Sequence, residues 1–97
     1  MKKNTPDNPA DAVLLEQLPG IGPAMAADLR LLGIIQPDQL TGQNAYSLYD
    51  SLCEKTGARH DPCVIDVFLG AIHYMNTGEA LPWWQFTPER KQTLDKP

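Results

Sequence analysis

Basic side chains are scarce in this sequence, and most of them lie near its two ends. The 97 residues hold eight lysines and arginines against 12 aspartates and glutamates, a formal net charge of −4 at pH 7. Between Asn8 and Thr87, three basic residues stand against nine acidic ones. Proteins that attract nucleic acid over long distances carry the opposite sign. Any contact with DNA must therefore work without a basic patch.

The sequence also has no long hydrophobic run. Its most apolar stretch, residues 64–75, contains Asp66 and His73 and is too short to cross a bilayer. After the basic start Met1-Lys2-Lys3, polar residues and prolines stand where a secretion signal would have its apolar region. These absences predict a cytoplasmic protein that does not enter a membrane.

No segment alternates between polar and apolar residues for long enough to predict a β-strand. Helix caps, prolines and glycines instead divide the chain into short helices, so we expect an all-α fold. The chain length allows one domain, which we place at residues 8–88, between a flexible arm at residues 1–7 and a tail at residues 89–97. The five predicted helical segments are residues 9–17, residues 23–32, a connecting turn at residues 36–40, residues 45–56 and residues 62–76, with one further short turn starting at Thr87.

The segment over residues 62–76 is predicted to be the central helix. Its apolar residues cover more than half of its circumference, so Phe68 should be almost fully buried. Asp66, Gly70 and His73 fall on the remaining face.

Aromatic residues make up 7% of the chain, and two of them are adjacent, Trp83 and Trp84. Exposed, this pair would be a platform on which nucleic-acid bases stack. We favour the alternative that the pair closes the core, because burying one such ring stabilises a small domain by several kcal/mol at about 25 cal/mol per Å². By the same reasoning we expect Tyr49 to point inward and Tyr46 to lie at the surface.

The most informative motif is Leu18-Pro19-Gly20-Ile21-Gly22, between the first two predicted helices. Gly20 and Gly22 permit backbone angles and a close approach that a Cβ would prevent. Ile21 is expected to point into the core and to pin the turn. Pro23 starts the next helix, whose first backbone N–H groups should point outward. Such a helix N-terminus attracts anions, although the motif is also explained by a tight turn with no ligand.

The stretch LPGIGPAMAADLRLLGI, Leu18 to Ile34, resembles the first motif of the helix-hairpin-helix superfamily. Over about residues 10–88, the chain also resembles a small bacterial family labelled "pathogenicity locus" or mitomycin-resistance-associated helix-hairpin-helix protein. The residues that carry this second resemblance are Leu52-Cys53-x-x-Thr56-Gly57, Asp61-x-Cys63-Val64, Phe68 and Trp83-Trp84.

The resemblance implies a compact five-helix domain with two helix-hairpin-helix units, a SAM-like arrangement. The second hairpin, residues 57–60, is degenerate because it has no Gly-x-Gly. The resemblance also implies DNA binding, and a monovalent cation held by the carbonyls of the first hairpin.

One departure from the superfamily pattern concerns the residues after the second glycine. DNA-binding versions usually carry Lys or Arg there, whereas this chain has Pro23 and Ala24, and Pro23 has no N–H to donate. In the second hairpin, Arg59 is a better candidate for a phosphate contact than His60. The predicted DNA-phosphate-binding residues are Gly20, Ile21, Gly22, Ala24 and Arg59.

The two cysteines, Cys53 and Cys63, are expected to be shielded thiols where the fourth and fifth helical segments meet, rather than a disulfide. With His60 and His73 they do not match a standard zinc-finger or ribbon spacing, so no metal is expected. The position of Cys63 near a helix start is one where the pKa of a thiol can be lowered.

Catalysis has little support in the sequence. Ser47 and Ser51 lie on a helix without a nucleophile elbow, and the chain is too short for the second subdomain of a helix-hairpin-helix glycosylase. We therefore predict a non-enzymatic protein without a cofactor, which binds DNA weakly and without reading its sequence, in DNA repair or tolerance of mitomycin damage. The alternative is a protein–protein adaptor that kept the fold and lost the DNA contacts, which the acidic surface favours.

Overall fold

The protein is built of short helices joined by tight turns. Its computed structural model describes residue 6 and residues 8–95, and no strand occurs in this part of the chain. The all-α prediction is therefore confirmed, but the described residues form four α-helices rather than five. They are α1 (Pro23–Leu31), α2 (Ala45–Thr56), α3 (Cys63–Thr77) and α4 (Thr87–Asp95), with 3-10 turns η1 (Pro9–Asp11), η2 (Leu15–Gln17), η3 (Pro37–Leu40) and η4 (Trp83–Phe86).

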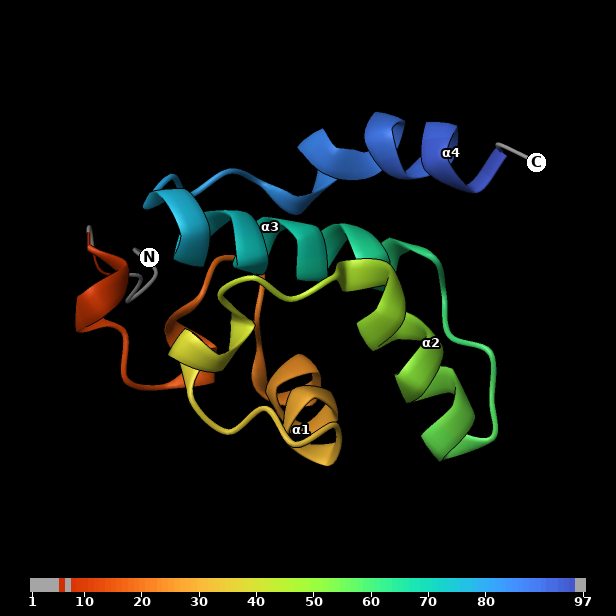
Figure 1. The fold of residues 1–97 in the computed structure, drawn as a ribbon, viewed down its shortest axis with the longest axis horizontal. Coiled ribbons are helices and arrows are strands. Elements are labelled where there is room, and N and C mark those ends of the chain that lie inside the picture. Colours follow the sequence, from red (N-terminus) through yellow and green to blue (C-terminus); the bar gives the residue numbers. More distant parts are fainter. Residues whose placement is uncertain (1–5, 7, 96–97) are drawn as a thin grey trace.

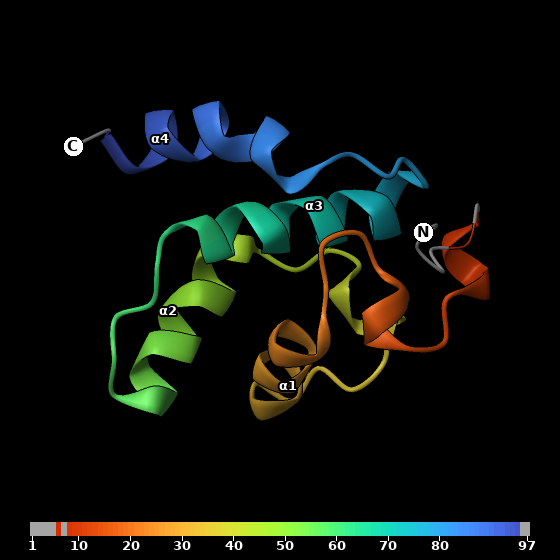
Figure 2. The same cartoon turned by 180° about the vertical axis from the view of Figure 1, so that it is seen from behind.

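Helix α3 lies in the middle of the molecule. Figures 1 and 2 show α4 on one side of it and α1 and α2 on the other. Phe68 and Ala71 have no exposed surface, as expected of a central helix, so the prediction for Phe68 is confirmed. None of the helices in the described residues is long and apolar enough to cross a bilayer.

The predicted helix over residues 9–17 is wrong. Asn8 does cap a helical start, accepting a hydrogen bond from the Ala10 amide at 3.0 Å, but η1 ends at Asp11. The chain then runs extended until η2 begins at Leu15. The Gln17 side chain explains this restart, because its Oε1 accepts hydrogen bonds from the amides of Val13 and Leu14, both at 2.8 Å.

Helix α2 has the predicted bounds, and a capping residue stands at each of its ends. The Asn44 side chain accepts hydrogen bonds from the amides of Tyr46 and Ser47 at 2.9 and 3.1 Å, which satisfies two donors of the first turn. At the other end, Gly57 has φ 67°, a left-handed conformation that favours glycine.

Helix α4 lies on a face of α3 that we did not expect to be covered. We expected a single short turn after Thr87, but the helix continues to Asp95, through most of the segment assigned to the tail. Asp66 is completely buried beneath it, and the ring of Phe86 lies 3.5 Å from where a Cβ on Gly70 would stand. The division into domain and tail stays a prediction.

The expectation that Trp83 and Trp84 close the core is wrong, since their exposed fractions are 39% and 59%. Turn η4 begins directly after Pro82 and directs Phe86, rather than the tryptophans, onto α3. Tyr49 is buried as predicted. Tyr46 is half-buried instead of lying at the surface, and its hydroxyl has no hydrogen-bond partner among the described residues.

Candidate functional site

The glycine turn, residues 18–22, connects η2 to α1 and is anchored by two buried side chains. Leu18 and Ile21 are 1% and 4% exposed, and the Ile21 amide donates to the Leu18 carbonyl at 3.1 Å. Gly20 has φ 76°, where a residue with a Cβ would be strained. The prediction that Ile21 pins the turn from inside the core is confirmed.

Gly22 behaves differently from what we predicted. Its φ of −94° and ψ of −174° are open to any residue, and a Cβ added there would meet no atom within 4 Å. Neither the backbone nor the packing of this chain therefore requires a glycine at this position. The missing side chain leaves the start of α1 open to an approach from outside.

The first backbone amides of α1 bond to no group among the residues that the structure describes. Pro23 occupies the first helical position, and the Ala26 amide is the first to bond within the helix, to the Gly22 carbonyl at 2.9 Å. Within the described part of the chain, the amides of Gly22, Ala24 and Met25 donate to no acceptor. They are free to meet an anion, and the dipole of this nine-residue helix adds attraction.

The basic side chain on α1 is occupied elsewhere. Arg30 pairs with Glu16 of η2, Nη2 lying 3.0 Å from Oε1, and hydrogen bonding to this guanidinium lowers the pKa of the Glu16 carboxyl. Both residues are exposed. The pair joins η2 and α1, the two elements on either side of the glycine turn. Because Glu16 neutralises the charge of Arg30, the polarised amides at the start of α1 are the groups of this region that attract an anion.

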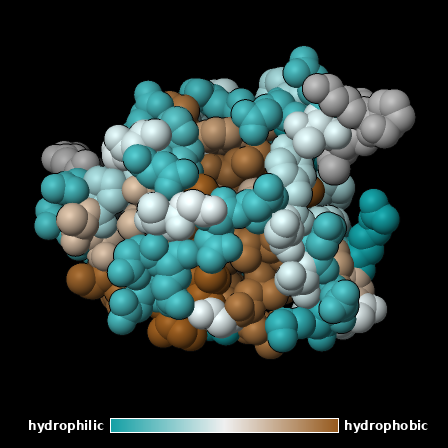
Figure 3. All heavy atoms as spheres, viewed as in Figure 1, coloured by the Kyte–Doolittle hydropathy of each residue, from teal (hydrophilic) through white to brown (hydrophobic). Residues whose placement is uncertain are grey.

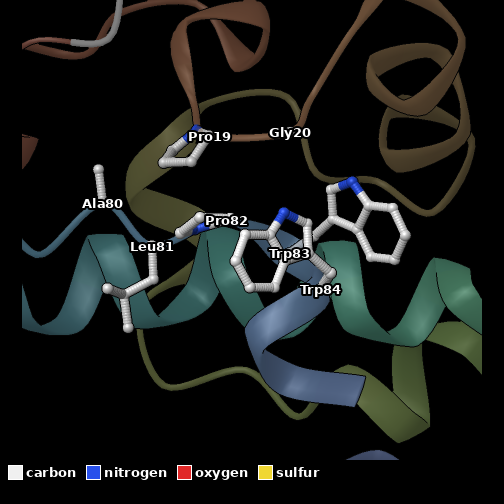
Figure 4. Close-up of a pocket in the computed structure, with 7 residues that line it drawn as sticks. All are labelled: Pro19, Gly20, Ala80, Leu81, Pro82, Trp83 and Trp84. Atoms are coloured by element: carbon white, nitrogen blue, oxygen red, sulfur yellow. The ribbon is translucent and has the colours of Figure 1, made fainter.

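An open groove borders the glycine turn. It has a volume of about 460 Å³ and lies between that turn and the segment leading into η4. Figure 4 shows both indole rings extending from η4 toward the turn. We call it the tryptophan groove, and its lining residues, none of them charged, are Pro19, Gly20, Ala80, Leu81, Pro82, Trp83 and Trp84.

The second predicted hairpin is held by side chains rather than by glycines. The Tyr49 hydroxyl donates to the His60 carbonyl, and Thr56 Oγ1 lies 2.9 Å from His60 Nε2. Arg59 is exposed and shares a shallow groove with the acidic residues Asp50 and Glu54.

The structure separates the two predicted phosphate sites. The turn after α2 lies at one end of the molecule, whereas the glycine turn crosses α3 near its middle (Figures 1 and 2). Gly20, Ile21, Gly22 and Ala24 therefore lie together at the glycine turn, and Arg59 stands apart from them. That these residues bind phosphate stays a prediction.

The cysteines and histidines do not converge on a metal site. Cys53 and Cys63 are free and half-buried, and His73 Nε2 lies 2.7 Å from Glu79 Oε1. Across the described residues, no three His, Cys, Asp or Glu side chains gather as metal ligands would. The lowered pKa that the position of Cys63 near a helix start would allow does not occur: hydrogen bonding to the Asp61 carboxylate, followed by burial, raises the pKa of this thiol.

The sequence did not predict the tryptophan groove, which brings together Pro19, Pro82 and the two tryptophans. Each was visible, but only the folded chain places Pro19 and Pro82 on the same groove. A Cβ on Gly20 would lie 3.9 Å from Trp83 Cδ1, so the turn and η4 are neighbours.

Comparison with known proteins gives two matches. The chain matches the Cdd1 family, described as pathogenicity locus, over residues 8–92. It is also 33% identical over 85 residues to the mitomycin resistance protein McrB of Streptomyces lavendulae, an alignment covering 88% of this chain and 81% of that protein. No solved structure shows a significant match. Because the family match spans nearly the whole chain, this protein belongs to the pathogenicity-locus family.

Proposed function

We propose that this protein is a non-enzymatic, sequence-independent DNA-binding protein of the helix-hairpin-helix type, which acts in the cytoplasm in tolerance of DNA damage. The observation that carries the proposal is the set of amides at the start of α1 that bond to no acceptor among the described residues. They lie next to Gly22, where neither the backbone conformation nor the packing requires a glycine. The 33% identity to a protein named for mitomycin resistance supports the link to damage tolerance.

In this proposal, η2, the glycine turn and α1 form the first helix-hairpin-helix unit. The first arm is reduced to one 3-10 turn, but Leu18 and Ile21 still hold the turn against the core. The second unit consists of α2, the turn at residues 57–62 and α3. Arg59 contributes less there, because Asp50 and Glu54 share its surface.

The mechanism is the capture of one phosphate oxygen by the amides of Gly22 and Ala24. Such contacts fix a nucleic-acid backbone without reading bases, which makes the binding non-specific. Catalysis is no part of this mechanism, because the glycine turn and the tryptophan groove contain no acid, base or nucleophile. We also expect weak binding, no tighter than micromolar, because the net charge of −4 repels DNA.

The test is to add charges of opposite sign at the start of α1 and to measure binding of labelled DNA by fluorescence anisotropy at low salt. Ala24 is exposed, and Ala24→Lys should tighten binding about tenfold, because a charge-assisted hydrogen bond contributes ~1.5 kcal/mol. Gly22→Asp should abolish binding, because its carboxylate occupies the same amides and repels phosphate.

The matched control is Leu31→Lys, at the opposite end of α1, where the side chain is 50% exposed. This variant adds the same charge away from the amides and should change the affinity less than twofold. If Ala24→Lys and Leu31→Lys act alike, or if the wild-type protein at micromolar concentration binds no DNA, the glycine turn is not a DNA contact.

A second candidate function, a protein–protein adaptor, is favoured by exposed aliphatic side chains. On the face drawn in Figure 3, apolar side chains reach the surface at several places between hydrophilic ones. The most exposed aliphatic residues lie around η2, η3 and the end of α1, and they are Val13, Leu14, Leu31 and Ile35. Failure of DNA binding together with capture of one specific protein, lost on Leu14→Asp, would support this function.

A further inference from the structure

The tryptophan groove exposes two indole rings, and phosphate binding at the glycine turn does not explain their exposure. We infer that the groove holds one unpaired nucleobase, stacked on Trp84, so that the DNA this protein prefers is single-stranded or locally unpaired. This inference rests on the proposed DNA-binding function and specifies its substrate.

Both indoles are exposed to solvent. Trp84 is 59% exposed and Trp83 is 39% exposed, whereas Phe68 of the core has no exposed surface. Large aromatic surfaces left in water are unfavourable, and on nucleic-acid-binding proteins they serve as stacking platforms for bases. Figure 4 shows both rings on the side of η4 that faces the glycine turn, where a base bound beside the turn would meet them.

The groove is uncharged. The protein is acidic overall, yet none of the seven residues that line the groove carries a charge. A nucleotide entering the groove therefore meets no carboxylate there, while the α1 amides nearby attract its phosphate. The groove and the turn together complement a ligand with an apolar ring and an anionic group.

The groove borders the start of α1. Gly20 lines the groove and Gly22 caps α1, and two residues of extended chain span at most about 7 Å. The edge of the groove at Gly20 is therefore within about the length of one nucleotide of the amides. A base in the groove and the phosphate of the same or the next nucleotide at the amides are the contacts that we assign to one short stretch of single strand.

A duplex cannot make both contacts along its length. Its internal bases are covered on both faces by their stacked neighbours, so a base must leave the stack before an indole can cover it. The groove consequently adds affinity for unpaired nucleotides, whereas the amides contact phosphates of either form.

The experiment compares Trp84→Ala, Trp84→Phe and the wild-type protein by anisotropy of labelled oligothymidylate and of a labelled blunt duplex. Ile35→Ala is the matched control, because Ile35 is 57% exposed and lies outside the groove. Circular dichroism confirms that each variant is folded. In a Trp83→Phe background, Trp84 is the single tryptophan, and its fluorescence should be quenched by oligothymidylate.

We expect Trp84→Ala to weaken binding of oligothymidylate about tenfold, to leave duplex binding unchanged, and Trp84→Phe to restore most of the loss. Equal binding of both DNAs by the wild type, with no effect of Trp84→Ala, would overturn the inference and leave the proposed function standing. Absence of any DNA binding would overturn both. Quenching of Trp84 by a proline-rich peptide and not by oligothymidylate would assign the groove to a protein partner instead.

Discussion

Asp66 on α3 and Arg90 on α4 form an ion pair in the interior of the molecule. Arg90 Nε lies 2.9 Å from Asp66 Oδ1, and Thr87 Oγ1 donates to Asp66 Oδ2 at 2.7 Å. Asp66 is completely buried, and the hydrogen bond to it raises the pKa of the Arg90 guanidinium. The carboxylate thus has partners on two sides, both supplied by α4.

Removal of Arg90 alone should destabilise the protein. Arg90→Met leaves the Asp66 carboxylate buried without its counter-ion, and we expect a loss of about 3–5 kcal/mol in the free energy of unfolding, measured with urea. The double variant Asp66→Leu with Arg90→Met removes both charges and should recover most of that loss. A loss below about 1 kcal/mol for Arg90→Met would show that water reaches Asp66.

Phe68→Ala should lower the free energy of unfolding by about 3–5 kcal/mol, because the ring has no exposed surface and its truncation leaves a cavity in the core beside the central helix. In a domain of this size that loss is enough to unfold most molecules at 25 °C. Leu31→Ala is the control, since its half-exposed side chain should change stability by less than about 0.5 kcal/mol. A folded Phe68→Ala variant with an unchanged melting temperature would contradict the assignment of α3 as the core.

Gly22→Asp should stabilise the protein while abolishing DNA binding. The backbone at Gly22 already has the extended conformation of an N-cap, and a Cβ there meets no other atom. An aspartate can accept hydrogen bonds from the amides of Ala24 and Met25 and interact with the helix dipole, for a gain of about 0.5–1 kcal/mol. Thermal unfolding measures this gain, and a lower melting temperature would mean that the amides are not accessible to a side chain.

The salt dependence of DNA binding should be shallow. Each neutralised phosphate contributes about −0.9 to the slope of log affinity against log salt, and backbone amides carry no full charge. We therefore expect a slope shallower than about −2 for a site of one or two phosphates. Titrations at several salt concentrations measure it, and a steep slope would point instead to basic side chains as the contact.

Alkylation of Cys63 should be slow near neutral pH. The raised pKa keeps the thiol protonated, and the protonated form does not react. Asp61→Asn keeps the cap on the Cys63 amide but removes the negative charge, so the thiolate should form at lower pH and the rate should rise. Mass spectrometry in a Cys53→Ser background follows the reaction, and an unchanged pH profile would exclude Asp61 as the cause.

Local signals predicted the parts of the fold that local interactions determine. Asn44 and Gly57 mark the ends of α2 because a side-chain cap and a left-handed glycine act within a few residues. Phe68 was identified as core because its helix has a wide apolar face. The break between η1 and η2 was missed because it depends on one side chain, Gln17, which bonds back to the chain.

The rest of the site depends on contacts between segments distant in sequence. Asp66 was placed on the open face of its helix, since its partner lies 24 residues later on a helix with almost no apolar residues. Without α4 in view, Trp83 and Trp84 were the obvious aromatic cover for the core. In the structure, α4 and Phe86 cover this face of α3, and the two tryptophans line the groove instead.

The attachment of α4 also has a consequence for how the protein opens. Among the described side chains of α4, those of Arg90 and Thr87 bond to the buried Asp66, and the helix has almost no apolar residues in its sequence. A helix attached in this way can separate while the packing around Phe68 persists. The amides of α4 should then exchange with deuterium well before those of α3. Local opening would therefore begin at the C-terminal end, below the free energy of the cooperative unfolding that urea measures.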